Sequence, residues 1–322
     1  MTDFFMLEQI QKMIKAMPKP RLIMRKGVTV KGYFRPYMSL KDYTEAALFE
    51  EPEVITPVTV RFASVLGDKG RADTGRNIKS MAVKFHLQDQ VYDMICQNIP
   101  VTMINKVTDL PKAMEIFHIR DYFDGIDSKK LWKYAVDHKE CLNFVLMLYS
   151  HLGLGDSFIN INMFSVNTYK WISKTSTEHL VRYKWVPAVT GYEKISSTNT
   201  MTINTAEFIA GFDPDRAMDE VINKVMNNEF PAFDLHVQMV GGSRIRDVKY
   251  TDNTIIWNEK DAPYMCIGTM ILDRIDESKA DDDMVYFLPG NTIDGIELCV
   301  DELSQIMDFM FRTEAIERGG YM

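Results

Sequence analysis

Alternating apolar and polar positions predict most of the regular structure of this 322-residue chain. Segments in which β-branched or aromatic residues alternate with polar ones are typical of strands, whereas apolar residues that repeat every three or four positions are typical of helices. These patterns predict strands over residues 58–65, 80–86, 99–104, 158–171, 179–185, 233–240 and 265–272, and helices over residues 1–17, 129–149, 215–226 and 293–312. Together the elements predict an α+β fold with a large, mostly antiparallel sheet.

The composition is that of a globular protein, and it argues against several classes of partner. Hydrophobic residues make up 46% of the chain and charged residues 25%, and the net charge of −8 opposes binding to nucleic acid or to an anionic membrane surface. No stretch has the pattern of a signal peptide or of a membrane span. The four cysteines are widely spaced, which predicts free thiols in a reducing cytoplasm rather than disulfides.

Residues 61–85 carry three closely spaced motifs. They are R-F-x-x-V from Arg61, A-D-T-x-R from Ala72 and A-V-K-F from Ala82. With similar segments before and after them, these motifs resemble the core of the haem catalase family over nearly the whole chain. The resemblance implies an antiparallel eight-stranded β-barrel with flanking helices and a haem buried beside the barrel. It also implies a helical arm over residues 1–20 and one catalase-like core domain over residues 21–322, as in the shortest members of the family.

The resemblance places altered chemistry where the family has its catalytic iron. The position of the axial tyrosinate is Phe311, which has no lone pair for a metal, and the position of the arginine one helical turn earlier is Met307. The distal histidine corresponds to Met24, whose thioether cannot act as an acid or base near neutral pH. The distal asparagine corresponds to Gln97, and the serine that bonds the distal imidazole corresponds to Ala63.

The resemblance also places three retained arginines, Arg21, Arg61 and Arg318, where the family binds the haem propionates. Converging guanidinium groups repel each other unless an anion lies among them, which favours an anionic ligand such as haem. Alternatively, the three arginines pair with protein carboxylates or water. If haem is bound, Met24 is the candidate ligand, because thioether sulfur can ligate haem iron. The sequence thus leaves haem open with a weakened site, and it indicates no other cofactor and no metal-binding set.

These substitutions predict a catalase-fold protein that lacks classical dismutation of hydrogen peroxide and keeps part of a pocket for a small-molecule or anionic ligand. One alternative is a haem-dependent oxidoreductase, either a peroxidase or a hydroperoxide-converting enzyme, with non-standard axial ligation. A second alternative is a haem-free structural or assembly protein. Without haem, Met24, Met307 and Phe311 would fill or line an apolar cavity, a task that suits flexible methionine side chains. The resemblance also implies a homo-oligomer, either a dimer or a tetramer.

Overall fold

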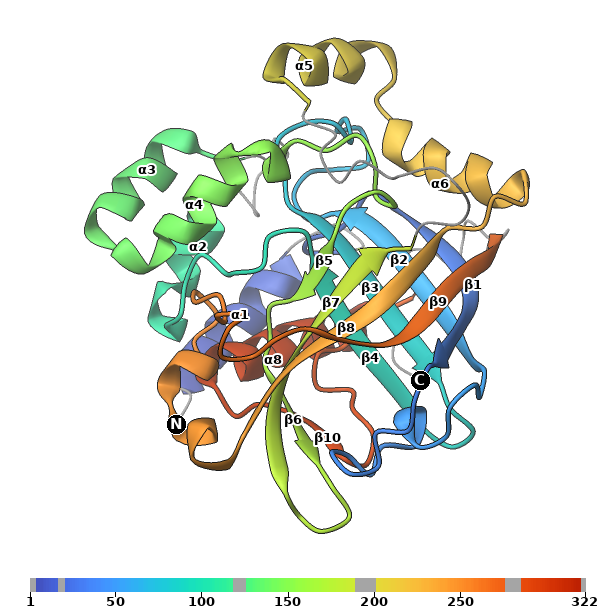
Figure 1. Cartoon of the computed structure of the whole chain (residues 1–322). Helices are drawn as coiled ribbons and strands as arrows, with labels where there is room; N and C mark the ends of the chain where they lie inside the picture. The colour runs from blue at the N-terminus through green and yellow to red at the C-terminus, as the bar shows by residue number, and fades with distance from the viewer. Residues whose placement is uncertain (1–3, 17–20, 118–125, 189–200, 276–284, 320–322) are drawn as a thin grey trace.

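The structure is a computed structural model that describes residues 4–16, 21–117, 126–188, 201–275 and 285–319. Its centre is a closed barrel of antiparallel strands (Figure 1). The eight barrel strands, in spatial order, are β7 (Glu178–Pro187), β5 (Met163–Ser165), β4 (Val91–Gln97), β3 (Lys79–His86), β2 (Thr56–Ser64), β1 (Gly27–Pro36), β9 (Met265–Ile275) and β8 (Ala232–Gly241). Pairing of β8 with β7 closes the ring, while β6 (Tyr169–Ile172) and β10 (Ile296–Leu298) extend the sheet beside β7. The predicted α+β fold with an eight-stranded antiparallel barrel is confirmed.

The described helices flank the barrel (Figure 1). They are α1 (Phe4–Ala16), α2 (Leu110–Ile116), α3 (Ser128–Asp137), α4 (Leu142–Tyr149), α5 (Ile203–Phe212), α6 (Arg216–Met226) and α8 (Glu302–Glu317). Helix α1 is the helix predicted at the N-terminus, and its Ile10 and Ile14 are buried in one apolar cluster with residues of α2, α4 and α8. None of the described helices is both long and apolar enough to cross a bilayer.

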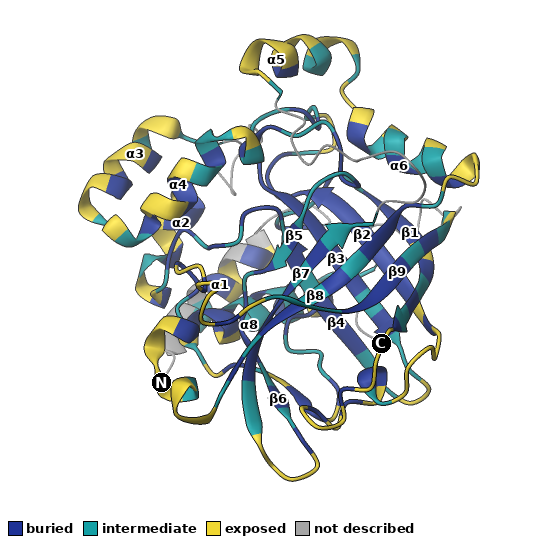
Figure 2. Cartoon of the chain, in the orientation of Figure 1, coloured by how far each residue is buried: buried dark blue, intermediate teal, exposed yellow. Residues whose placement is uncertain are grey.

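The barrel interior is a packed aromatic core. Because successive strand residues point to opposite faces, every second residue of each strand points inward. The ring of Phe34 makes edge-to-face contacts with Phe85 at 5.5 Å and with Trp185 at 6.0 Å between centroids. The strands are accordingly buried along most of their length (Figure 2). The interior of the described barrel is thus packed with side chains, and the cavity described below lies outside it, against the helices.

Strands β1 and β9 join segments from opposite ends of the chain. They are antiparallel, with Phe34 opposite Met270, and a bulge between Lys31 and Gly32 shifts the register. Glycine is required at position 32, because a Cβ atom there would lie 2.0 Å from the carbonyl oxygen of Ile271. This close approach brings the two strands together and completes the barrel wall.

Two predicted strands differ from the structure. Residues 99–104 form no strand: Pro100 has no N–H to donate, and Ile99, Val101 and Met103 are buried under the helices rather than paired in the sheet. The strand lies just before this segment, as β4. The predicted strand over 158–171 is only partly regular, with β5 and β6 separated by residues 166–168. In these segments, some apolar residues are buried without being paired in the sheet, and they give the sequence the same apolar pattern as a strand.

Two predicted helices have different limits in the structure. The helix predicted over 129–149 is broken into α3 and α4 at His138, whose φ of −124° and ψ of 84° are not helical. The break lets both apolar faces reach the core. The helix predicted over 293–312 begins only at Glu302, because Gly295 adopts a φ of +79° and residues 296–298 form β10. Strand β1 and helices α2 and α5 were not predicted.

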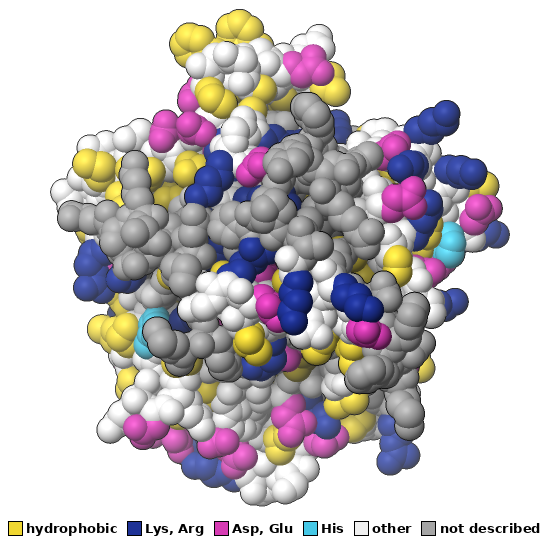
Figure 3. Space-filling model, turned by 180° about the vertical axis from the view of Figure 1, so that it is seen from behind, with side chains coloured by type: hydrophobic (Ala, Val, Ile, Leu, Met, Phe, Trp, Pro, Cys, Tyr) yellow, Lys and Arg dark blue, Asp and Glu magenta, His cyan; other side chains and the backbone are white. Residues whose placement is uncertain are grey.

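Helix α5 projects from one end of the molecule with apolar side chains in solvent. Phe208 is 74% exposed and Phe212 is 82% exposed, and their rings stack with centroids 6.4 Å apart. Seen from behind, hydrophobic side chains gather on this helix at the top of the molecule (Figure 3). Large exposed apolar groups of this kind mark contact surfaces more often than isolated ones do.

Candidate functional site

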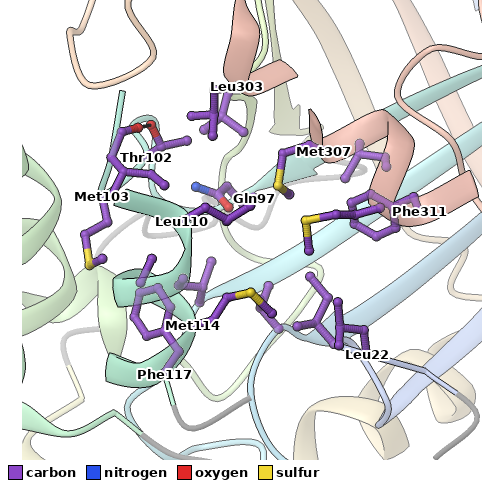
Figure 4. Close-up of a pocket in the computed structure, with 18 of the residues that line it drawn as sticks. Leu22, Gln97, Thr102, Met103, Leu110, Met114, Phe117, Leu303, Met307 and Phe311 are labelled. Atoms are coloured by element: carbon purple, nitrogen blue, oxygen red, sulfur yellow. Dashed lines mark hydrogen bonds between the residues drawn. The ribbon is translucent and has the colours of Figure 1, made fainter. Parts of the chain in front are cut away.

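A cavity of about 180 Å³ lies between the outer face of the barrel and helices α2 and α8. Figure 4 shows its wall, to which Gln97 contributes from β4, Met114 from α2, and Met307 and Phe311 from α8. The remaining wall is almost entirely aliphatic, aromatic or thioether. Its polar members are Gln97, Thr102, Asn167 and Glu314. The cavity is therefore suited to an apolar occupant.

Helix α8 presents one face to the cavity. Asp301 caps its N-terminus by accepting a hydrogen bond from the Ser304 N–H at 2.8 Å. The wall residues on this helix recur at the three- and four-residue spacing that places side chains on one helix face. They are Leu303, Met307, Met310, Phe311 and Glu314. The cap fixes where the helix begins, and so fixes which residues of this stripe face the barrel.

The Gln97 side chain projects from the end of β4 into the cavity (Figure 4). Its amide Nε2 donates to the carbonyl oxygen of Ile99 at 2.9 Å and to that of Val101 at 3.2 Å. The Thr102 hydroxyl donates to the Ile104 carbonyl at 2.7 Å. The side chains of Gln97 and Thr102 thus hydrogen-bond to backbone carbonyl groups of the irregular segment after β4. These bonds hold the segment and also fix both side chains in the cavity wall.

Met24 stands at the boundary of the cavity in an unusual backbone conformation. Its φ of +57° is in the left-handed region, which a methionine rarely adopts. Its N–H donates to the Val65 carbonyl at 2.9 Å, and its own carbonyl accepts from Arg61 Nη1 at 2.8 Å. The Ser80 hydroxyl lies 3.5 Å from its sulfur. Surrounding contacts hold this backbone in place, and strain retained in this way is typical of functional sites.

A second, much smaller cavity of about 20 Å³ adjoins the first and shares Met24, Ile95 and Phe311 with it. Arg21 and Arg61 line it together with Tyr286 and Phe287. The Arg21 guanidinium stacks 4.9 Å from the centre of the Tyr286 ring and donates to the Val285 carbonyl. These two arginines therefore face the chain's own residues rather than an open anion pocket.

Arg318, the third predicted arginine, lies beside a carboxylate of its own helix. It ends helix α8, and its Nε is 3.6 Å from Glu314 Oε1. The same carboxylate oxygen accepts a hydrogen bond from the Leu22 N–H. Burial raises the pKa of Glu314, while the Leu22 N–H and the neighbouring arginines partly oppose that rise. A carboxylate of the chain itself thus lies where the sequence predicted an external anion among the arginines.

The structure brings together four of the residues predicted from the resemblance: Met24, Gln97, Met307 and Phe311 all line the larger cavity. Arg318 lines neither of the two cavities. Sequence reasoning missed Glu314, which follows Met310 by four positions and so shares its helix face. It also missed Tyr286, Phe287 and the α2 wall residues, which lie in segments without a motif or a long periodic pattern.

A separate cluster of Asp109, His138 and Glu140 lies outside this cavity. One potential ligand atom from each residue lies within 4.8 Å of the others. The His138 ring stacks on Tyr134 at 3.9 Å, and its Nδ1 is 3.3 Å from Glu140 Oε1. These contacts give the histidine a structural partner, and the prediction that the chain has no metal site stays a prediction.

The fold and the site define a β-barrel protein with an apolar cavity between the barrel and its helices. A sequence model of the catalase family matches residues 1–321, and the chain belongs to that family. It is similar to a catalase of Alkalihalophilus pseudofirmus and to catalase-2 of Bacillus subtilis, each 28% identical over 99% of this chain and 47% of the relative. A catalase of Methanosarcina barkeri is 27% identical over 99% of this chain and 63% of its own length. The chain thus spans about half to under two thirds of these relatives.

Proposed function

We propose that this catalase-family protein does not dismutate hydrogen peroxide and instead binds a small, mainly apolar molecule in the cavity beside α8. The observation that carries the proposal is the chemistry of the cavity wall. No imidazole or phenol group is among the described residues of that wall, so it lacks the proton-transfer group and the tyrosinate that the resemblance leads one to expect. Met24, Met307 and Phe311 take those positions.

Haem, which family membership implies, does not fit these residues. Cavities that enclose drug-sized ligands measure roughly 300–1,000 Å³, and a porphyrin is larger than most such ligands. The cavity of about 180 Å³ is below that range. The space beside Arg21 and Arg61, where propionates would bind, is only about 20 Å³ and is lined by Tyr286 and Phe287. We therefore assign no chemical step to haem.

The apolar wall of the cavity favours a bound ligand. The cavity is only partly enclosed, so an apolar molecule that binds there removes wall surface from water. Each Å² of apolar surface covered in this way stabilises the complex by about 25 cal/mol.

The proposal is tested with purified protein in two assays. Addition of hydrogen peroxide should release no more oxygen than buffer alone, and addition of haemin should leave the absorption band of free haemin unshifted. Oxygen release at catalase-like rates, or a Soret band shifted by ligation, would overturn the proposal. A shifted band together with oxidation of an added electron donor would favour the haem-dependent peroxidase instead.

A reconstruction tests whether a lack of space or a lack of ligands excludes haem. Because the cavity is too small for a porphyrin, the triple variant Phe311→Tyr, Met24→His, Met307→Arg should bind haemin no more tightly than the natural chain. The matched control is Phe309→Tyr, which adds a phenol to α8 at a residue that does not line the cavity. Tighter haemin binding by the triple variant than by the control would show that the cavity admits haem and lacks only its ligands.

A further inference from the structure

The orientation of the Gln97 side-chain amide determines which of its polar atoms faces the cavity. Both groups that contact Gln97 Nε2 are carbonyl oxygens, of Ile99 and Val101. A carbonyl can only accept, so only the nitrogen of the amide can face these two oxygens, and the usual ambiguity between amide oxygen and nitrogen does not arise. The Gln97 oxygen therefore faces away from that segment, toward the space between α2 and α8 (Figure 4).

The other polar groups of the wall make contacts within the protein. The Thr102 hydroxyl donates to Ile104, and the Asn167 oxygen accepts from the Ser304 hydroxyl at 3.3 Å. The Glu314 carboxylate accepts from the Leu22 N–H and lies near Arg318. Glu314 is also the only ionisable side chain in the described wall of this cavity, and it is acidic. A carboxylate ligand would thus meet the buried Glu314 carboxyl group and no cation of the described wall.

We infer that the cavity takes an uncharged, mainly apolar molecule that carries one hydroxyl group, which donates to the Gln97 Oε1. This inference rests on the proposed function and names the class of ligand for the same cavity. An apolar cavity of about 150 Å³ in another protein holds benzene. The cavity of about 180 Å³ here accommodates a ring of that size with one or two further atoms. Small phenols and alcohols of similar volume belong to this class.

Two ligands of matched shape, p-cresol and p-xylene, and one larger anion, p-toluate, test the inference by calorimetry. The proteins are the natural chain, Gln97→Met, which keeps the side-chain length but lacks the acceptor, and Gln88→Met, the same substitution at an exposed residue outside the cavity wall. In the natural chain, the ratio of p-cresol to p-xylene affinity should be about fivefold higher than in Gln97→Met, the effect of one net hydrogen bond. Gln88→Met should keep the natural ratio, and p-toluate should bind most weakly.

Failure of the inference and failure of the proposed function give different results. An unchanged cresol-to-xylene ratio in a folded Gln97→Met variant, or preferred binding of p-toluate, would overturn the inference and leave an apolar-ligand cavity in place. Binding of none of the three to the natural chain would overturn both. Ala113→Leu adds a side chain to the wall from α2 and should abolish binding of all three, because Ala113 lines the cavity. Undiminished binding to that variant would place the ligands elsewhere and overturn the inference.

Discussion

At the scale of single residues, Lys79 shows how strongly burial alters chemistry in this fold. Its side chain is fully buried, and its ammonium donates to the carbonyl oxygens of Asp73 and Gly75. Burial lowers the pKa of Lys79 from 10.5 to about 8. Between these two values the folded protein holds fewer protons than the unfolded chain, so stability contributed through this group rises with pH.

We expect this titration to be measurable against Lys79→Met. From pH 7.5 to 9.5 the natural chain should gain about 2 kcal/mol of unfolding free energy relative to the variant, because the cost of deprotonating the buried ammonium fades over that interval. Urea unfolding of both proteins at the two pH values measures the difference. Parallel pH profiles would show that Lys79 keeps an ordinary pKa.

The residues of the candidate site could be found from sequence only where a motif reaches them. Motif spacing led to Met24, Gln97, Met307 and Phe311, and all four meet at one cavity. The space beside Arg21 and Arg61 could not be read in the same way, because Tyr286 and Phe287 line it and come from a segment without a motif. Arg318 was expected beside Arg21 and Arg61, yet a carboxylate of its own helix lies next to it.

At the scale of elements, an ion pair fastens helix α6 to the barrel. Lys26 Nζ lies 3.1 Å from Asp73 Oδ1, with both side chains almost fully buried, and Asp73 Oδ2 accepts from the Met218 N–H in the first turns of α6 at 3.1 Å. Lys26 also contacts Asp215 at 2.6 Å, but that carboxylate is 56% exposed. One buried carboxylate thus joins the start of the barrel to a helix far along the chain.

Asp73→Ala should therefore destabilise the protein by about 3 kcal/mol, since it leaves the buried Lys26 ammonium with two backbone carbonyls and, as its ion-pair partner in the described structure, an exposed carboxylate. Asp215→Ala is the matched control, because it removes the exposed partner of the same ammonium and should cost less than about 1 kcal/mol. Urea unfolding near neutral pH compares the two variants. Equal losses would mean that burial does not distinguish the two ion pairs.

Strands could be predicted from the sequence where they pair regularly with their neighbours in the sheet. Strands β7, β8 and β9 were predicted to within a few residues of their observed limits, because their alternation reflects the inner and outer faces of the barrel. Strand β1 was missed because Gly27, Gly32 and Lys31 interrupt its pattern. The glycine at position 32 is needed for contact with β9, and that requirement lies in a partner strand more than 200 residues away in sequence.

At the scale of the whole molecule, filling the cavity should stabilise the fold. Ala113→Leu should raise the midpoint of thermal unfolding, since filling a cavity commonly adds about 0.5–2 kcal/mol. The matched control is Ala135→Leu on α3, which enlarges a buried alanine that does not line the cavity and should destabilise the fold. Differential scanning calorimetry of the two variants tests this, and a lower midpoint for Ala113→Leu would show that the cavity is already filled or closed.

The exposed apolar face of α5 leads to a prediction about assembly. We expect the protein to form a dimer or tetramer, and expect the double variant Phe208→Ser, Phe212→Ser to weaken association, because it removes two rings that are 74% and 82% exposed. Val248→Ser is the control, as Val248 is also 74% exposed but belongs to another element, the short 3-10 helix Val248–Tyr250. Sedimentation measurements that find the natural chain and the double variant equally associated would exclude α5 from the contact.

Closure of the barrel through β1 and β9 also governs the order in which the newly made chain can fold. Met265 leaves the ribosome 229 positions after Pro36, so β1 waits on the order of 10–50 s for its partner at ordinary rates of synthesis. During that interval one edge of β1 has no neighbouring strand to hydrogen-bond its N–H and C=O groups. Unpaired edges of this kind can pair with other chains and cause aggregation. Production of this protein in cells is therefore expected to depend on chaperones that shield the nascent sheet until its last strand arrives.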